Sequence, residues 1–395
     1  MAVMFAGYCA FLQLYATQPI LPLLADLFHA GKVAVSLTVT AGGIGVAMGA
    51  PVAGYLADRL GRKRVIVWSA FLLAAATLVT VLVQSLYALI CWRFVQGLFT
   101  PGIFAVTIAY INDEWSAGGA SKALANYVSG TVLGGFSSRM ISGLVAAHWP
   151  WQWVFVVLGA IGLAGACALA AWLPVERTAR GKQVRAPGHN WWSAVRSHLH
   201  NPQLLATFIV GFCVLFSLVS TFTYVTFYLA DPPFNLQPAA LGLVFVVYLV
   251  GAAITPLSAR AVDRYGHRVT LAAAIGTGVL GIVCTLVPSL WVVALGLAIC
   301  CSGVFLAQAS ASGFIGIAAK ENRALAAGIY ASFYHTGGSV GAAVPGFVWA
   351  LGGWPACVVF IAGVQLVTVT LALTLWKDQT PSAHDVPWTS PTELE

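Results

Sequence analysis

The stretch "GYLADRLGRKR", residues 54–64, places one aspartate and four basic side chains between two long apolar segments. A shorter copy, "DRYGHR", occupies residues 263–268, so that its aspartate lies 205 residues after the first one. A second pair of similar stretches, "YVSGTVLGG" (127–135) and "YHTGGSVGA" (334–342), is offset by 207 residues. Two matches at nearly the same offset indicate that the chain consists of two related halves.

The composition around these stretches is that of a membrane protein. Of the 395 residues, 59% are hydrophobic and 8% are charged, and the mean hydropathy is +0.87. A soluble domain has about 25% charged residues. The net charge of +7 would suit a nucleic-acid partner, but the basic residues fall in short gaps between apolar runs, which argues against one. The eight cysteines lie in apolar runs without metal-ligand spacing, so no metal site and no cofactor are expected.

A helix needs about 20 mostly apolar residues to cross a bilayer, and twelve segments of the chain meet this requirement. The predicted fold is an all-α membrane protein with twelve transmembrane helices in two pseudo-symmetric six-helix bundles. The predicted spans are residues 2–24, 33–55, 65–84, 87–111, 123–147, 152–173, 203–229, 238–258, 268–287, 290–316, 324–348 and 353–375.

The longest polar segment separates the first six spans from the last six. We expect residues 1–173 to form an N-terminal bundle, 174–202 a cytoplasmic linker, 203–376 a C-terminal bundle and 377–395 a cytoplasmic tail. The linker combines charges, Gly, Pro and paired tryptophans, which is typical of a connection with an interfacial helix. The tail is rich in Pro, Ser and Thr, which predicts disorder.

Basic residues gather on one side of the predicted membrane. Sixteen of the nineteen lysines and arginines fall in the loops and tail on the side of both termini, and the opposite loops hold only Lys32. Cytoplasmic loops carry such an excess of positive charge. The sequence therefore predicts a multi-pass protein of the cytoplasmic (inner) membrane with both termini in the cytoplasm.

Several motifs resemble those of a known family. "GYLADRLGRKR" resembles the loop 2–3 signature of the major facilitator superfamily, and "RFVQG" (93–97) resembles its span-4 signature. "QPILPLLA" (18–25) and "SGTVLGGFSSRMISG" (129–143) are similar to its twelve-span drug–proton antiporter branch, and more narrowly to the YnfM-like members. The resemblance implies a monomer in the lipid bilayer that binds a small-molecule substrate and protons and rocks its two halves about a central site.

The same resemblance implies gates in the cytoplasmic loops. Asp58 and Arg62 are four residues apart, which is one helical turn, and an acid at the end of span 4, Asp113 or else Glu114, would join them. A glycine before them would let helices approach closely. The alternative is a positively charged loop with incidental ion pairs. The expected gating residues are Gly54, Asp58, Arg62, Asp113, Asp263 and Arg264.

Two arginines, Arg93 and Arg139, lie inside predicted spans, where a charge is unfavourable by about 2.5–3.5 kcal/mol or more. None of the twelve acids lies at mid-membrane in the predicted spans. A cationic cargo would therefore meet an unfavourable field, and a neutral or anionic one is favoured. For Arg93, which matches the family's arginine implicated in proton coupling, the alternative is bonding to carbonyl groups. For Arg139 the alternative is a structural pair with Asp26.

The proton-coupling group is a separate question. His335 is the one histidine placed well inside a span, and histidine titrates near neutral pH. The alternative is a neutral core histidine, and Asp26, Asp113 and Arg93 are further candidates for coupling. Besides the two arginines, polar and aromatic side chains are expected to bind the substrate, or else to pack between helices: Gln13, Gln18, Tyr224, Tyr228, Gln308, Tyr330 and Tyr334.

The sequence holds no nucleotide-binding loop, metal motif or nucleophile set, so an enzyme is not expected. The prediction is a secondary active transporter that exports a small neutral or anionic organic molecule in exchange for protons. Two alternatives stay open. One is proton-coupled uptake of an organic acid, and the other is a membrane receptor that uses the same scaffold without transporting.

Overall fold

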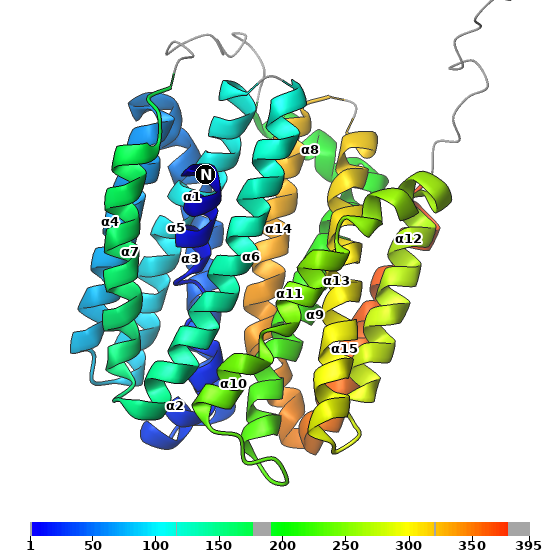
Figure 1. Ribbon diagram of the computed structural model, residues 1–395. Helices are drawn as coiled ribbons and strands as arrows, with labels where there is room; N and C mark the ends of the chain where they lie inside the picture. Colours follow the sequence, from blue (N-terminus) through cyan, green and yellow to red (C-terminus); the bar gives the residue numbers. More distant parts are fainter. Residues whose placement is uncertain (1, 116, 177–190, 320, 378–395) are drawn as a thin grey trace, which may run out of the picture.

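The computed structural model describes residues 2–115, 117–176, 191–319 and 321–377, and every element in these ranges is helical (Figure 1). The prediction of an all-α chain is thus confirmed. The predicted linker and tail lie mostly outside the described residues, which omit 177–190 and 378–395.

The helices of the first half stand side by side, from blue to green in Figure 1. Short 3-10 helices, Gln18–Ile20 and Thr80–Leu82, precede α2 and extend α4. The α-helices are α1 (Ala2–Phe11), α2 (Leu21–Leu27), α3 (Lys32–Leu60), α4 (Arg62–Val79), α5 (Leu86–Glu114), α6 (Ala117–His148) and α7 (Gln152–Trp172).

The second half repeats this arrangement on the other side of the molecule (Figure 1). It begins with a short helix of the linker, α8 (Trp191–His200). The remaining helices are α9 (Pro202–Ala230), α10 (Pro238–Val244), α11 (Val247–Ile254), α12 (Leu257–Cys284), α13 (Leu290–Ala318), α14 (Arg323–Ala343) and α15 (Pro345–Leu375).

Eight helices of the described chain are long and apolar enough to cross a membrane. They are α3, α4 with its 3-10 extension, α5, α7, α9, α12, α13 and α15. The other four predicted spans fall on α1–α2, α6, α10–α11 and α14. Two of these four consist of short, divided helices, and α6 and α14 carry many Gly and Ser residues, which lowers their mean hydropathy.

Two predicted spans are interrupted. The first span stops at Phe11, passes through turns at residues 12–17 and resumes at Gln18. The eighth span is divided at Phe245 and Val246, between α10 and α11. Where a helix is interrupted, some backbone carbonyl and N–H groups lose their helical hydrogen-bond partners. Inside a membrane these groups need other partners, because water is absent there. The two interruptions are also where the side chains of the candidate site converge.

The repeated motif interrupts the helical backbone in both halves, where it ends α3 in the first half and kinks α12 in the second. Gly61 follows "DRL" with φ of 95°, and Gly266 follows "DRY" with φ of 77°. Only glycine adopts this region without strain, because a Cβ atom would collide with the backbone. The glycine of each copy therefore sets the corner between two spans.

The two bundles pack together toward one end of the molecule. We call the end with residues 54–64 and 263–268 the motif end, at the top of Figure 1, and the opposite end the Lys32 end. Near the Lys32 end α3 packs on α14, where Thr40 Oγ1 donates to the Ser339 carbonyl at 3.0 Å. There α6 also packs on α10, so closely that a Cβ added at Gly143 would collide with the Pro238 carbonyl oxygen. The bundles are thus closed on each other at the Lys32 end.

Candidate functional site

Arg139 of α6 lies at the boundary between the two bundles and is only 3% exposed. Its Nε donates to Gln18 Oε1 at 2.8 Å, and its Nη1 donates to the Gly135 carbonyl at 2.7 Å. The ring of Tyr15 lies with its centroid 4.5 Å from the guanidinium carbon. Gln18 and Tyr15 reach Arg139 because the first span breaks between α1 and α2 at this level.

The opposite bundle covers the rest of the Arg139 side chain. Phe245 and Tyr248, at the break between α10 and α11, lie with their ring centroids 4.9 and 4.8 Å from its guanidinium carbon. Gln18 Nε2 also donates across the boundary, to Thr223 Oγ1 of α9 at 3.1 Å. Arg139 and Gln18 therefore connect the two bundles in this conformation, in which the Lys32 end is closed.

Arg93 of α5 is 1% exposed and has a different kind of surroundings. Its Nη1 donates to the Gln13 carbonyl at 2.8 Å and also contacts Gln96 Oε1, while its Nη2 donates to the Leu14 carbonyl. Both carbonyl groups lie just beyond the C-terminal end of α1, so no helical N–H group is available to them. A positive charge at this end of a helix is also favoured by the helix dipole. Arg93 thus stabilises the interruption of the first span from within its own bundle.

A buried polar network surrounds Arg93. Gln13 Oε1 accepts from Thr77 Oγ1, and Gln96 Nε2 donates to Thr80 Oγ1 at 2.8 Å. These residues belong to the first half of the chain. Gln13, expected to bind substrate, is therefore placed inside the N-terminal bundle, next to the base of the interrupted span.

Neither buried arginine pairs with a carboxylate in the described part of the chain. Their recorded acceptors are backbone carbonyls and glutamine side chains, which are neutral. Asp26 is exposed near the end of α2, so the alternative of an Arg139–Asp26 pair is wrong for this structure. Buried charges are normally paired, so an unbalanced buried cation points to a site for negative charge.

The substrate candidates of the second half divide between helix packing and the bundle interior. The hydroxyl of Tyr224 donates to the Ala342 carbonyl at 2.8 Å and ties α9 to α14. Tyr228 stacks on Trp354, with ring centroids 5.6 Å apart. Both tyrosines therefore contribute to packing within the C-terminal half.

Three further candidates form a chain of contacts on α13 and α14. Tyr330 donates its hydroxyl hydrogen to Gln308 Oε1 at 2.8 Å and stacks on Tyr334 at 6.0 Å between centroids. His335, next in sequence, faces the other bundle, with its ring 5.4 Å from that of Phe104 on α5. Among the candidates for proton coupling, His335 is thus placed between the bundles and Asp26 at the protein surface.

At the motif end the repeat forms only part of the expected network. Because α3 ends at Leu60, Asp58 and Arg62 lie on different helices, so the expectation of a one-turn pair is wrong. The expected contact with the acid at the end of α5 is present, since Arg62 forms an ion pair with Asp113. Glu176, at the start of the linker, accepts from the backbone N–H of Arg62 at 2.8 Å.

The remaining gating candidates are exposed. A Cβ added at Gly54 would meet no atom within 4 Å, so the expected close helix approach does not occur there in this conformation. Asp58 and Asp263 are exposed at corresponding places in the two copies. Arg264 lies over the ring of Tyr265, at 5.2 Å.

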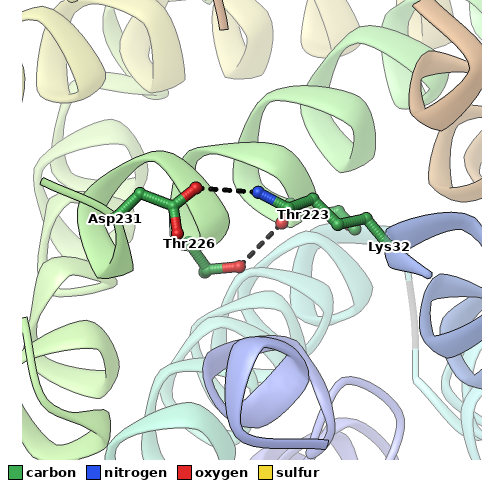
Figure 2. Close-up of polar contacts among 4 residues, drawn as sticks. All are labelled: Lys32, Thr223, Thr226 and Asp231. Atoms are coloured by element: carbon green, nitrogen blue, oxygen red, sulfur yellow. Dashed lines mark hydrogen bonds and ion pairs between the residues drawn. The ribbon is translucent and has the colours of Figure 1, made fainter. Parts of the chain in front are cut away.

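An ion pair lies across the bundle boundary at the Lys32 end, and Figure 2 shows it. Lys32 Nζ, at the start of α3, lies 2.8 Å from Asp231 Oδ2, at the end of α9, so this contact joins the two bundles. The Lys32 ammonium also lies 4.1 Å from the centre of the Trp349 ring. One turn or so before Asp231, Thr226 donates to the Thr223 carbonyl at 2.7 Å, as the second dashed line in Figure 2 marks.

Sequence reasoning missed the partners that come from the opposite half of the chain. Phe245 and Tyr248 are ordinary members of an apolar run, and no local signal links them to Arg139. Lys32 and Asp231 are 199 residues apart. The one usable signal was that Lys32 is the only basic residue predicted on its side of the membrane, where a nearby acid would be a natural partner.

Comparisons with known proteins agree with this architecture. The family model described as Major Facilitator Superfamily matches residues 3–233 and 228–393. The chain belongs to the major facilitator superfamily.

Individual relatives of this facilitator carry transporter names. The inner membrane transport protein YnfM of Escherichia coli (strain K12) is 29% identical over 377 residues, which cover 95% of this chain and 90% of YnfM. The 3-(3-hydroxy-phenyl)propionate transporter of the same organism is 25% identical over 260 residues, covering 65% of this chain and 62% of that protein. The facilitator is thus a multi-pass membrane transporter rather than an enzyme.

A solved structure shows the same fold. A point mutant of the nucleoside transporter NupG matches with a TM-score of 0.75 at 15% sequence identity, and the match covers 95% of this chain and 99% of NupG. At this identity the likeness concerns the fold alone. It agrees with the two pseudo-symmetric bundles predicted from the repeat, so the predicted fold class is confirmed.

Proposed function

We propose that this facilitator exports a small neutral or anionic organic molecule in exchange for protons, by alternating access between its two bundles. The observation that carries the proposal is Arg139: a buried cation at the boundary between the bundles, bound only by neutral partners among the described residues. A site of this kind favours negative charge and opposes a cationic cargo. The export direction rests on the similarity to the drug–proton antiporter branch.

The orientation follows from the distribution of charge. With the basic motif loops in the cytoplasm, the Lys32 end faces outward. The contacts of Thr40 with Ser339 and of Lys32 with Asp231 then close the outer side, which corresponds to an inward-facing state of a monomer. On opening outward, these contacts separate, and the Arg62–Asp113 network at the cytoplasmic side takes part in closing the inner gate.

A second candidate is proton-coupled uptake of an organic acid. The name of one relative, a 3-(3-hydroxy-phenyl)propionate transporter, favours an organic acid as the cargo without giving a direction of transport. Arg139 suits import as well as export, because a cation stabilises a carboxylate whichever way the cargo moves. Direction is therefore a matter for flux measurements.

The deciding experiment is transport in proteoliposomes that contain the purified chain and an internal pH dye. A panel of labelled organic acids, neutral drugs and cationic drugs is offered, with empty liposomes as control. We expect anions or neutral molecules to move with protons in the opposite direction. Cotransport in one direction would establish uptake, transport of cations alone would refute the proposal, and no flux of any cargo would favour a receptor.

For the proton, His335 is our proposed carrier because it lies between the bundles, 5.4 Å from Phe104. We expect His335→Gln to abolish cargo-driven proton movement while exchange of labelled for unlabelled cargo, which needs no net proton transfer, continues. Asp26→Asn is the matched control, since Asp26 is exposed at the protein surface. Normal proton movement in His335→Gln with its loss in Asp26→Asn would assign the proton to Asp26 instead.

A further inference from the structure

The side chains that surround Arg139, which we call its cover, form two halves that belong to different bundles. Tyr15 and Gln18 are fixed to its own bundle, whereas the rings of Phe245 and Tyr248 come from the other. These two rings pack on further aromatic side chains of the C-terminal bundle. Tyr248 lies 4.6 Å from Phe222 between centroids and 5.7 Å from Phe305, and Phe245 lies 5.6 Å from Phe222.

Alternating access must separate these halves. When the Lys32 end opens, Phe245 and Tyr248 move away with their bundle, and the guanidinium of Arg139 loses two of its three recorded ring contacts. A ligand drives such a change only if it binds one state better than the other. A cargo that takes the place of the two lost ring contacts binds the open state better than the closed one, because it stabilises the Arg139 guanidinium where the rings no longer do.

The replacement must provide a negative charge and a flat apolar surface. A carboxylate matches the planar fork of a guanidinium with two parallel hydrogen bonds. A second negative charge would find no free terminal nitrogen on Arg93, because both are directed at acceptors in its own bundle. An aromatic ring would pack against Tyr15 while the Lys32 end is open, and against the faces of Phe245 and Tyr248 when the bundles close on it again.

We propose that Arg139, Tyr15, Phe245 and Tyr248 form a binding site for an aromatic monocarboxylate, in which Arg139 binds the carboxylate and the three rings select the aromatic group. This inference rests on the proposed function and names its substrate class. The two rings of the C-terminal bundle thereby serve both as the cover of Arg139 in the closed state and as the specificity-determining surface for the cargo.

The test is a competition assay with the full chain in proteoliposomes. Labelled benzoate is the probe, and unlabelled benzoate, cyclohexanecarboxylate, succinate and benzylamine are the competitors. We expect benzoate to compete about fivefold better than cyclohexanecarboxylate, which has a similar size but no flat ring. Succinate and benzylamine should compete at least about tenfold more weakly than benzoate, since one adds an unpaired charge and the other carries a cation.

Variants of the two rings test whether Phe245 and Tyr248 cause the preference for an aromatic cargo. In Tyr248→Leu and Phe245→Leu the preference for benzoate over cyclohexanecarboxylate should fall to about onefold to twofold, while transport of both still requires Arg139. Phe347→Leu is the matched control, because Phe347 is 65% exposed on α15, away from the buried Arg139. It should keep the wild-type preference.

The outcomes separate the two proposals. Equal competition by benzoate and cyclohexanecarboxylate in the wild type would overturn the aromatic site and leave anion transport intact. Transport of benzylamine without any anion would overturn the proposed function itself. The wild-type panel decides both points even if the leucine variants fail to fold.

Discussion

Arg93 and Arg139 lie in the same half of the chain and are buried to nearly the same degree, 1% and 3% exposed, yet their surroundings differ in kind. Every recorded acceptor of Arg93 belongs to its own bundle, and two of them are backbone carbonyls at the end of α1. Arg139 instead lies between the bundles, with two of its ring contacts coming from the opposite one. The position of a buried charge relative to the bundle boundary, rather than its burial, distinguishes a structural arginine from a candidate for cargo binding.

The difference has a thermodynamic consequence. In the proposed alternating access the two bundles move as bodies, so we expect the contacts of Arg93 to persist in every state. We expect those between Arg139 and the opposite bundle to be lost when the Lys32 end opens. Loss of Arg93 should therefore lower folding stability, whereas loss of Arg139 should change the balance between states and the binding of cargo.

The largest expected effect is on folding. Arg93→Leu leaves the carbonyls of Gln13 and Leu14 without a donor inside the membrane, and breaking such a buried charged network lowers the free energy of unfolding by about 3 kcal/mol or more. Thermal unfolding of the purified protein, followed by tryptophan fluorescence, measures the change. Arg93→Lys, which keeps the charge but not the forked geometry, should give an intermediate value. A wild-type melting temperature for Arg93→Leu would contradict the structural role of Arg93.

The next effect is on transport. Arg139→Gln removes the charge but keeps a hydrogen-bonding amide, and anion flux should fall by about 10- to 100-fold, the value of a charge-assisted hydrogen bond. Its melting temperature should stay closer to wild type than that of Arg93→Leu. Flux and melting temperature in proteoliposome and detergent samples of the same preparation provide the two readouts. Equal loss of stability in both variants would make Arg139 structural as well.

The smallest effect concerns the Lys32 end. Asp231 is 55% exposed, so its ion pair with Lys32 contributes about 0.2–1 kcal/mol after screening by solvent. The contact with Trp349 adds about 0.5–1 kcal/mol. Lys32→Glu should therefore lower the population of the closed state by a few fold, as measured by spin-label distances across the Lys32 end.

A charge exchange sharpens this result. Lys32→Asp combined with Asp231→Lys restores the ion pair but not the cation–π contact with Trp349, so the closed population should recover only in part. Full recovery would assign the closure to the ion pair alone. No change in either variant would show that packing of α3 on α14 and of α6 on α10 closes this end without help from charge.

The helical fold could be predicted from the sequence because the bilayer imposes length and hydropathy on each span, and because the repeated motif marks the same corner twice. Arg93, Arg139 and Gln18 could also be recognised as unusual polar residues in apolar surroundings. Their partners depend on tertiary structure. The interruption after Phe11 leaves no signal in hydropathy, since its turns are stabilised by Arg93, which comes 80 residues after Gln13 in the chain.

The same limit applies to the contacts between bundles. Phe245 and Tyr248 gain their role only because α10 packs on α6, which places them beside Arg139. The expected pair of Asp58 with Arg62 failed for a local reason, namely that Gly61 ends α3 between them. A one-turn spacing holds only while the helix continues, and the glycine of the motif was the signal that it does not.

The central claim is that Arg139 presents an unbalanced positive charge to the cargo, and Gln18→Glu tests it most directly. Gln18 Oε1 already accepts from Arg139 Nε at 2.8 Å, so the change places a carboxylate there with almost no change of shape. Labelled benzoate flux in proteoliposomes should fall at least about tenfold, while the melting temperature stays the same or rises. Wild-type anion flux in Gln18→Glu would contradict the account, because a neutralised Arg139 could not then be what attracts the cargo.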